Sequence, residues 1–236
     1  MNIVISALIT IGVFSTILSI LSNFDWHLEG FLNTVTGAVT NFIWVFMGAY
    51  IAAAIYSIRE PDLDIIVDDA YNSDTHYADG QRWKFFRVKV INRELPRFFT
   101  YIVPFITRYP ATGMRATIEF VQQKQLMKGR WSSSMELPSS LAADYIHLAN
   151  VPDTVTIGPG EIEALDVMAK YQYDSEAYGW NNESFLHAWR SPGYRLNTGD
   201  WEAIITVESA NGARVIKSFM LHIAPTIENT YIAQLR

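Results

Sequence analysis

The side chains that most often carry out chemistry are scattered along this sequence. Five histidines are present, and no two of them have the spacing of metal ligands: His27, His76, His147, His187 and His222. The chain has no cysteine, which excludes disulfides, thiolate catalysis and cysteine-bound metals. The serine run Ser132–Ser134 lacks the glycine-flanked turn of a hydrolase nucleophile. The sequence therefore predicts no enzyme and no metal or cofactor site.

Four acidic residues lie close together after the first 67 positions: Asp68, Asp69, Asp74 and Asp79. Carboxylates of this kind bind Ca²⁺ when they occur in the ligand order of an EF-hand, with its central glycine. Neither that order nor that glycine is present here. We therefore interpret the segment as a solvated acidic loop.

A second group of polar and aromatic residues lies in the segment Tyr173–Arg195. Aromatic side chains beside asparagine, glutamate and arginine are typical of protein contacts and sugar sites. They also occur in ordered loops whose asparagines bond their own backbone. Three interpretations stay open: an ordered structural loop, a protein contact and a small-molecule site. The residues proposed for a partner or ligand are Tyr178, Trp180, Asn181, Asn182, Glu183, Trp189 and Arg190.

The most apolar stretch after the first 60 residues is Leu95–Thr107, which contains two prolines and has arginines on both sides. One interpretation is a long connection packed over the end of a β-sandwich. The other is a surface that faces a membrane or a partner. For the second, the contact residues would be Phe98, Phe99, Tyr101, Ile102 and Phe105, together with Trp26 near the N-terminus.

Trp26 belongs to a region of very different composition. No lysine or arginine precedes Arg59, although the whole chain has 18 of them and a net charge of −6. Two uncharged segments, Ile3–Ser22 and Gly37–Tyr56, would each span roughly 30 Å as helices, which is the thickness of the bilayer core. A cleavable signal peptide is the alternative for the first, but it lacks a basic start and a small-residue cleavage site. Residues 1–58 are thus predicted to form a transmembrane hairpin, with helices at about 3–22 and 37–57 and Trp26 in the headgroup layer.

Four residues of the second segment fall on one side of a helix: Gly37, Asn41, Gly48 and Ala52. Small residues allow two helices to approach closely, and an asparagine in hydrocarbon requires a hydrogen-bond partner. The partner would be the first helix or another subunit. Arg59 at the helix exit favours a β domain in the cytoplasm by the positive-inside rule.

From residue 62 onward, apolar residues recur mainly at every second position. In Trp83–Asn92, Phe86, Val88 and Val90 alternate with basic residues, and the final pair of strands flanks Asn211-Gly212, a dipeptide that favours a tight turn. In Glu161–Gln172 the alternation changes phase, which predicts a β-bulge near Leu165. Seven to nine short strands indicate an antiparallel sandwich or barrel, and we expect an immunoglobulin-like β-sandwich over residues 62–236.

The segment Gly158–Arg195, with the motifs YGWNNES and WRSPGYRL, resembles prokaryotic membrane-anchored proteins with immunoglobulin-like β-sandwich domains. The resemblance extends over most of the β region. It implies that fold, and it implies no activity.

Two functions remain. The first is a non-catalytic membrane-anchored module, an accessory or assembly subunit of a membrane or envelope complex, whose partners are the lipid bilayer and other membrane subunits or further copies of itself. The second is a ligand-gated effector; two helices with a cytoplasmic β domain resemble antiphage effectors that bind cyclic nucleotides. Four basic residues would then meet a phosphate: Arg87, Lys89, Arg93 and Arg115. The acidic net charge argues against nucleic acid as a partner.

Overall fold

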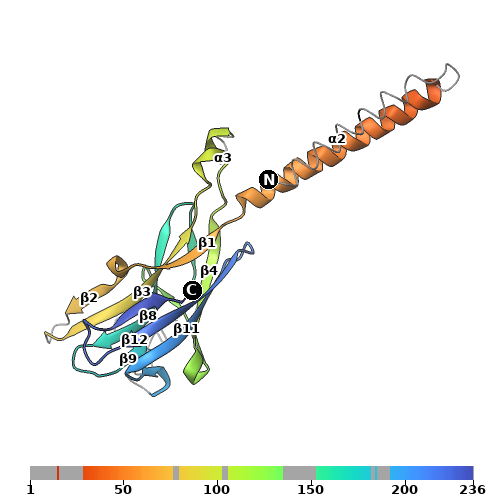
Figure 1. Cartoon of the computed structure of the whole chain (residues 1–236). Coiled ribbons are helices and arrows are strands. Elements are labelled where there is room, and N and C mark those ends of the chain that lie inside the picture. The colour runs from red at the N-terminus through yellow and green to blue at the C-terminus, as the bar shows by residue number, and fades with distance from the viewer. Residues whose placement is uncertain are drawn as a thin grey trace, which may run out of the picture. The chain divides into compact units, whose positions relative to one another are not determined.

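The computed structural model describes residues 15, 29–76, 80–102, 106–134, 153–181, 184 and 192–235. The chain divides into two compact units, Met1–Ile58 and Arg59–Arg236. The described part of the first is helical, and the second is built from two antiparallel β-sheets (Figure 1).

The helix α2 extends over Glu29–Arg59, so it begins earlier than the expected 37. Its part Val35–Arg59 is long and apolar enough to cross a membrane, with a mean hydropathy of 1.8 in a stretch of which no part is buried. The described residues thus hold one long helix and no hairpin. The first predicted helix, about 3–22, lies outside them except for Ser15, which is helical. Trp26 lies outside them as well.

Two sheets make up the second unit. The seven-stranded sheet contains β1 (Leu63–Val67), β2 (Ser73–His76), β3 (Arg82–Asn92), β6 (Arg130–Trp131), β8 (Ile162–Tyr171), β9 (Ala177–Gly179) and β10 (Arg195–Leu196). The six-stranded sheet contains β4 (Ala111–Phe120), β5 (Gln125–Lys128), β7 (Val155–Ile157), β11 (Gly199–Glu208), β12 (Arg214–Ile223) and β13 (Tyr231–Gln234). The short helix α3 (Arg97–Ile102) connects β3 to β4, and the described residues include 3₁₀ turns at Asp69–Tyr71, Val121–Gln123 and Pro192–Tyr194.

The main core lies between the sheets and confirms the expected alternation. Phe86, Val88 and Val90 of β3 are fully buried in it, as are alternate residues of β11 and β12. The all-β sandwich is therefore correct, with more strands than the seven to nine expected. An immunoglobulin-like topology stays a prediction.

β8 departs from simple alternation because it is buried on both faces. All of Ala164–Tyr171 is buried, and a second apolar cluster of Trp83, Phe85, Tyr171 and others lies on the face of its sheet away from the main core. Its pairing with β3 shifts register between Phe86 and Arg87. The predicted bulge is thus present, at Val167 rather than at Leu165.

Gly129 occupies the point where the chain crosses from one sheet to the other, between β5 and β6. Its amide donates to the carbonyl of Ala116 at 2.8 Å. A Cβ atom at this position would lie 2.7 Å from the Ala116 Cβ and 2.8 Å from a methyl carbon of Leu165. The close approach of the two layers here therefore requires a residue without a side chain.

The last hairpin has a wider turn than the expected two-residue turn. Glu208 and Arg214 form its last pair, and only Gly212 of the Asn211-Gly212 dipeptide has positive φ, at 93°. The side chain of Asn211 instead donates to the carbonyl of Pro110, at 2.9 Å. The asparagine thus fastens the hairpin to the start of β4.

Candidate functional site

The chain enters the β unit beside the loop that contains α3. Only residues 60–62 separate the end of α2 from β1. The backbone amide of Tyr109 donates to the carbonyl of Arg59 at 2.6 Å, and Arg59 Nε donates to the carbonyl of Thr107 at 3.2 Å. Arg108 Nη1 reaches the carbonyl of Glu60 at 2.9 Å. The returning arm of the α3 loop is thereby bonded to the entry segment.

Asn92, at the end of β3, holds this junction together from the inside. Its side chain is fully buried and accepts a hydrogen bond from the amide of Asp62 at 3.1 Å. Its Nδ2 donates to the carbonyls of Tyr109 at 2.9 Å and Ile157 at 3.2 Å. One side chain therefore joins the entry segment, the α3 loop and β7.

α3 itself presents aromatic side chains to the surroundings. The side chains of Phe98, Phe99 and Tyr101 are 67%, 40% and 89% exposed. The two phenylalanine rings pack edge to face, with 5.9 Å between their centroids. Figure 1 shows α3 projecting at the end of the β unit where β3 and β4 meet it. The side chains of Ile102 and Phe105 lie outside the described part. Exposed aromatics of this kind fit the interpretation of a membrane-facing or partner-facing surface.

A pocket of about 470 Å³ lies in the same loop. Its lining is mostly apolar and comes from Leu95, Ile106, Pro110 and Pro159, with Glu94, Thr107 and Arg108 beside them. The end of the β unit at which the chain enters thus offers both exposed rings and an apolar hollow.

A cluster of buried charges lies on β3, β6 and β8. Asp166 is 1% exposed and accepts hydrogen bonds from Arg87 Nε at 2.6 Å and from Arg130 Nη1 at 2.5 Å. Arg130 is 4% exposed, and its Nη2 donates to the carbonyl of Ser134 at 3.1 Å. Two guanidinium groups therefore share one buried carboxylate.

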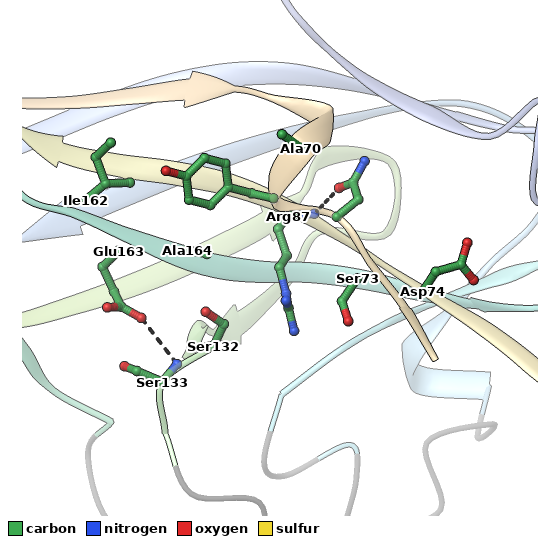
Figure 2. A pocket seen from close by; sticks show the side chains of 11 residues that line it. Ala70, Ser73, Asp74, Arg87, Ser132, Ser133, Ile162, Glu163 and Ala164 are labelled. Atoms are coloured by element: carbon green, nitrogen blue, oxygen red, sulfur yellow. Dashed lines mark hydrogen bonds between the residues drawn. The ribbon is translucent and has the colours of Figure 1, made fainter. Parts of the chain in front are cut away.

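Arg87 extends from this cluster into an open polar pocket of about 630 Å³ (Figure 2). The figure shows its guanidinium between Ser73 on one side and Ser132 and Ser133 on the other. Glu163 faces the pocket and accepts a hydrogen bond from the amide of Ser133 at 3.2 Å. Asp74, also at the rim, pairs with Arg82 at 2.7 Å.

The structure does not bring the four predicted phosphate-binding residues together. Arg87 lines the pocket, whereas Lys89 pairs with Asp68 at 3.1 Å. Arg93 pairs with Asp64, and Arg115 lies on β4 in the other sheet. A phosphate site built from all four is therefore wrong for this fold.

Asp64 is itself part of a second charge cluster, which closes the edge of the sandwich. Lys217 of β12 binds Asp64 Oδ1 at 2.5 Å and also donates to the carbonyl of Ile65 at 2.9 Å. Burial raises the pKa of Asp64, but Lys217 and Arg93 more than offset this and hold the pKa below its ordinary value.

Hydrogen bonds order the described part of the predicted acidic loop. Asp68 caps the turn Asp69–Tyr71 by accepting from the amide of Ala70, and its hydrogen bond with Lys89 lowers its pKa. Asp74 belongs to β2, and Asp79 is outside the described residues. Among the described residues no three histidine or acidic side chains are grouped as metal ligands.

The two histidines in the described part of the chain are not grouped as metal ligands either. His222 lies 2.6 Å from Asp200, and its ring stacks on Tyr231. His76 ends β2, and the remaining three histidines fall outside the described part of the chain.

The YGWNNES motif forms a structural loop where it is described. Tyr178, Trp180 and Asn181 are all buried. Ser184 donates its amide to Asn181 Oδ1 at 2.7 Å, and Asn181 Nδ2 donates to the carbonyl of Lys128 at 3.0 Å. This bonding favours the structural interpretation for these residues. Four further predicted contact residues lie outside the described part: Asn182, Glu183, Trp189 and Arg190.

Within the described part of the chain, the small-residue side of α2 is exposed. Gly37, Asn41, Gly48 and Ala52 are all exposed, and no described atom lies within 4 Å of a Cβ built on either glycine. Their role in helix packing stays a prediction.

Sequence reasoning missed two residues of the buried charge cluster that contacts Arg87. Asp166 and Arg130 are far from Arg87 along the chain, and only the register of β8 with its neighbours brings them together. The one available signal was a charged residue inside the apolar run of β8.

No protein-family model and no curated protein sequence matches this chain. Among solved structures, a component of the archaeal flagellum of Methanospirillum hungatei strain JF1 was found with 12% identity and a TM-score of 0.32, covering 89% of this chain and 99% of that one. A likeness at this TM-score carries no conclusion about the fold or the role of the chain.

Proposed function

We propose that the protein is a non-catalytic membrane-anchored module that assembles with other membrane subunits or with further copies of itself. The observation that carries this proposal is the apolar span Val35–Arg59, whose most apolar stretch is not buried by any described part of the chain. Its exposed apolar side chains, among them Trp44 at 63% and Val45 at 70%, are unfavourable in contact with water. A bilayer covers such a helix on all sides.

The short tether then places one end of the β unit at the membrane surface. Three residues between α2 and β1 extend over about 10 Å at most. The α3 loop is bonded to that entry segment, so Phe98, Phe99 and Tyr101 reach the headgroup layer. Aromatic rings with arginines beside them favour this interface. The positive-inside rule applied to Arg59 favours a cytoplasmic β unit.

Assembly would use the open side of α2 that carries Gly37, Asn41, Gly48 and Ala52. Glycines let a second helix approach closely, and the amide of Asn41 finds its hydrogen-bond partner across the contact. The first predicted helix of the same chain is one candidate for this partner, and a neighbouring subunit is the other.

Extraction in a mild detergent tests the assembly. We expect a defined oligomer, or a stoichiometric partner, by light scattering coupled to size exclusion. Gly48→Leu, which blocks close approach, should reduce the oligomer or release the partner. Ala53→Leu is the matched control, because it adds a large side chain on the opposite side of the helix. A strictly monomeric extract in several detergents would contradict the proposal.

A further inference from the structure

We propose that the outer face of the six-stranded sheet binds the same face of a second copy, turned by half a rotation, whose anchor lies in an apposed membrane. This contact rests on the membrane anchor proposed above and is separate from the packing of α2. It is supported by the uncharged centre of the face, by the opposite charges at its two ends and by the place where the chain enters the β unit.

The centre of the face consists of residues that alternate with the core. In β11 the odd-numbered residues within 203–207 are fully buried, so Ile204 and Thr206 point outward. Their partners on β12 are Ser218 and Ile216, and Ile216 is 52% exposed. The middle of these two strands is therefore apolar or hydroxylated, and a partner can cover it without burying a charge.

The end of the face that contains the β11–β12 hairpin is basic. Glu208 lies there between its cross-strand partners Arg115 and Arg214. Lys128 of β5 follows as the partner of Thr117, two residues further along β4. All four charged residues are exposed, and together they have an excess of two positive charges.

The opposite end of the face is acidic. Asp200 and Glu202 of β11 point outward there, and so does Glu119 of β4. Lys124 lies in the turn between β4 and β5, so with His222 counted as neutral the excess is two negative charges. Eight residues of β11 separate Asp200 from Glu208, which is about 26 Å at roughly 3.3 Å per residue.

Two copies of such a face attract each other only when their strands run in opposite directions. A rotation by 180° about an axis that lies in the interface and crosses the strands places each basic end over the acidic end of the partner. With the strands in the same direction, like charges would face each other and repel. The charge pattern thus selects an antiparallel pair, in which every contact of opposite charges occurs twice.

The entry of the chain decides where the second copy is anchored. The amide of Tyr109, just before β4, donates to the carbonyl of Arg59, and Asn211 of the hairpin donates to the carbonyl of Pro110. The chain therefore enters at the basic end of the face. In the antiparallel pair the two entry segments lie at opposite ends, so the pair connects two membranes that face each other.

Light scattering by phosphatidylcholine vesicles that carry the full chain tests this contact. The vesicles used are those from which protease removes the β unit from outside. We expect them to cluster at low salt and to disperse at high salt, because the salt screens exposed charges. Vesicles without protein should not join the clusters.

Two double variants test whether the charges are complementary. Glu119→Lys with Glu202→Lys makes both ends of the face basic. Arg115→Glu with Arg214→Glu makes both ends acidic. Each variant alone should lose clustering, because like charges meet. A mixture of the two vesicle populations should regain it, because every basic end then meets an acidic one.

Glu94→Lys with Glu163→Lys is the control with an equal change of charge, since Glu94 follows β3 and Glu163 lies on β8, both strands of the other sheet. It should cluster like the unchanged protein. The inference is overturned if the control loses clustering, if protein-free vesicles join the clusters, or if the mixture clusters no better than either variant alone.

Unchanged protein whose vesicles stay dispersed, while the detergent extract is oligomeric, would overturn this contact and leave assembly through α2 in place. A chain that does not float with the vesicles would overturn both this contact and the membrane anchor.

Discussion

Replacing Asp166 by asparagine removes the negative charge from the buried cluster. The carboxylate is 1% exposed, and it neutralises Arg130, which is 4% exposed, as well as Arg87 at 18%. Breaking a buried pair by removing one partner costs about 3–5 kcal/mol, because the remaining charge is left uncompensated. That is a large part of the roughly 5–15 kcal/mol that stabilises a typical domain.

Thermal unfolding in detergent, followed by tryptophan fluorescence, measures this loss, because Trp131 is fully buried beside the cluster on β6. For a unit of this size about 1 kcal/mol shifts the midpoint by about 2–4 °C, so we expect a decrease of about 6–20 °C. Glu208→Gln is the control: its pair with Arg214 is more than half exposed on both sides, and its loss costs at most about 1 kcal/mol. A decrease for Asp166→Asn no larger than for this control would refute the reasoning.

Three further changes test the account of the fold. Because the pKa of Asp64 is lowered in the folded state, its ion pairs stabilise the fold fully above the ordinary pKa of 3.8, and this stabilisation is lost as the pH falls through the lowered pKa. The free energy of unfolding, measured in urea below pH 4, should therefore decrease with falling pH, and Asp64→Asn should lack this dependence. Asn92→Ala leaves three backbone groups without their partner and should cost about 2–4 kcal/mol in urea unfolding; a loss below about 1 kcal/mol would contradict the role of Asn92 at the junction. Gly129→Ala forces a Cβ into contact with Ala116 and should lower stability by about 1–3 kcal/mol; an unchanged midpoint would show that the layers separate freely.

The alternation of apolar and polar residues predicted the strands that have one face in the core and the other toward solvent. In β3 the apolar Phe86, Val88 and Val90 are buried between the sheets, and in β11 and β12 the same pattern holds. β8 is different because both of its faces are covered, so its sequence reads as a continuous apolar run with a phase change. That phase change still predicted the bulge.

Short strands in turn-rich segments could not be found in this way. β5 lies within a stretch that reads as a basic turn, and β13 has only four residues. Each pairs with a long neighbouring strand, β4 or β12. Their conformation depends on that pairing more than on their own sequence.

The pocket around Arg87 could not be predicted from the sequence, for a related reason. Arg87 alternates with core residues and therefore reads as a solvated strand residue. Its contact with Asp166 spans 79 positions and depends on the pairing of β3 with β8 beside the bulge. The α3 loop, by contrast, stands out by its apolar and aromatic composition alone, although composition left open whether it packs over the sandwich or faces a membrane or partner.

The most direct test of the membrane account uses single cysteines in this cysteine-free chain, each carrying a nitroxide spin label. Val45→Cys reports on the middle of α2, Tyr101→Cys on α3, and Leu126→Cys on β5, which pairs with the end of β4 farthest from α3. In lipid vesicles we predict that oxygen relaxes the label at 45 most strongly, that a water-soluble nickel complex relaxes the label at 126 most strongly, and that the label at 101 is intermediate. A label at 45 that the nickel complex reaches as readily as the label at 126 would contradict the membrane span, and a label at 101 indistinguishable from 126 would contradict the placement of α3 at the membrane surface.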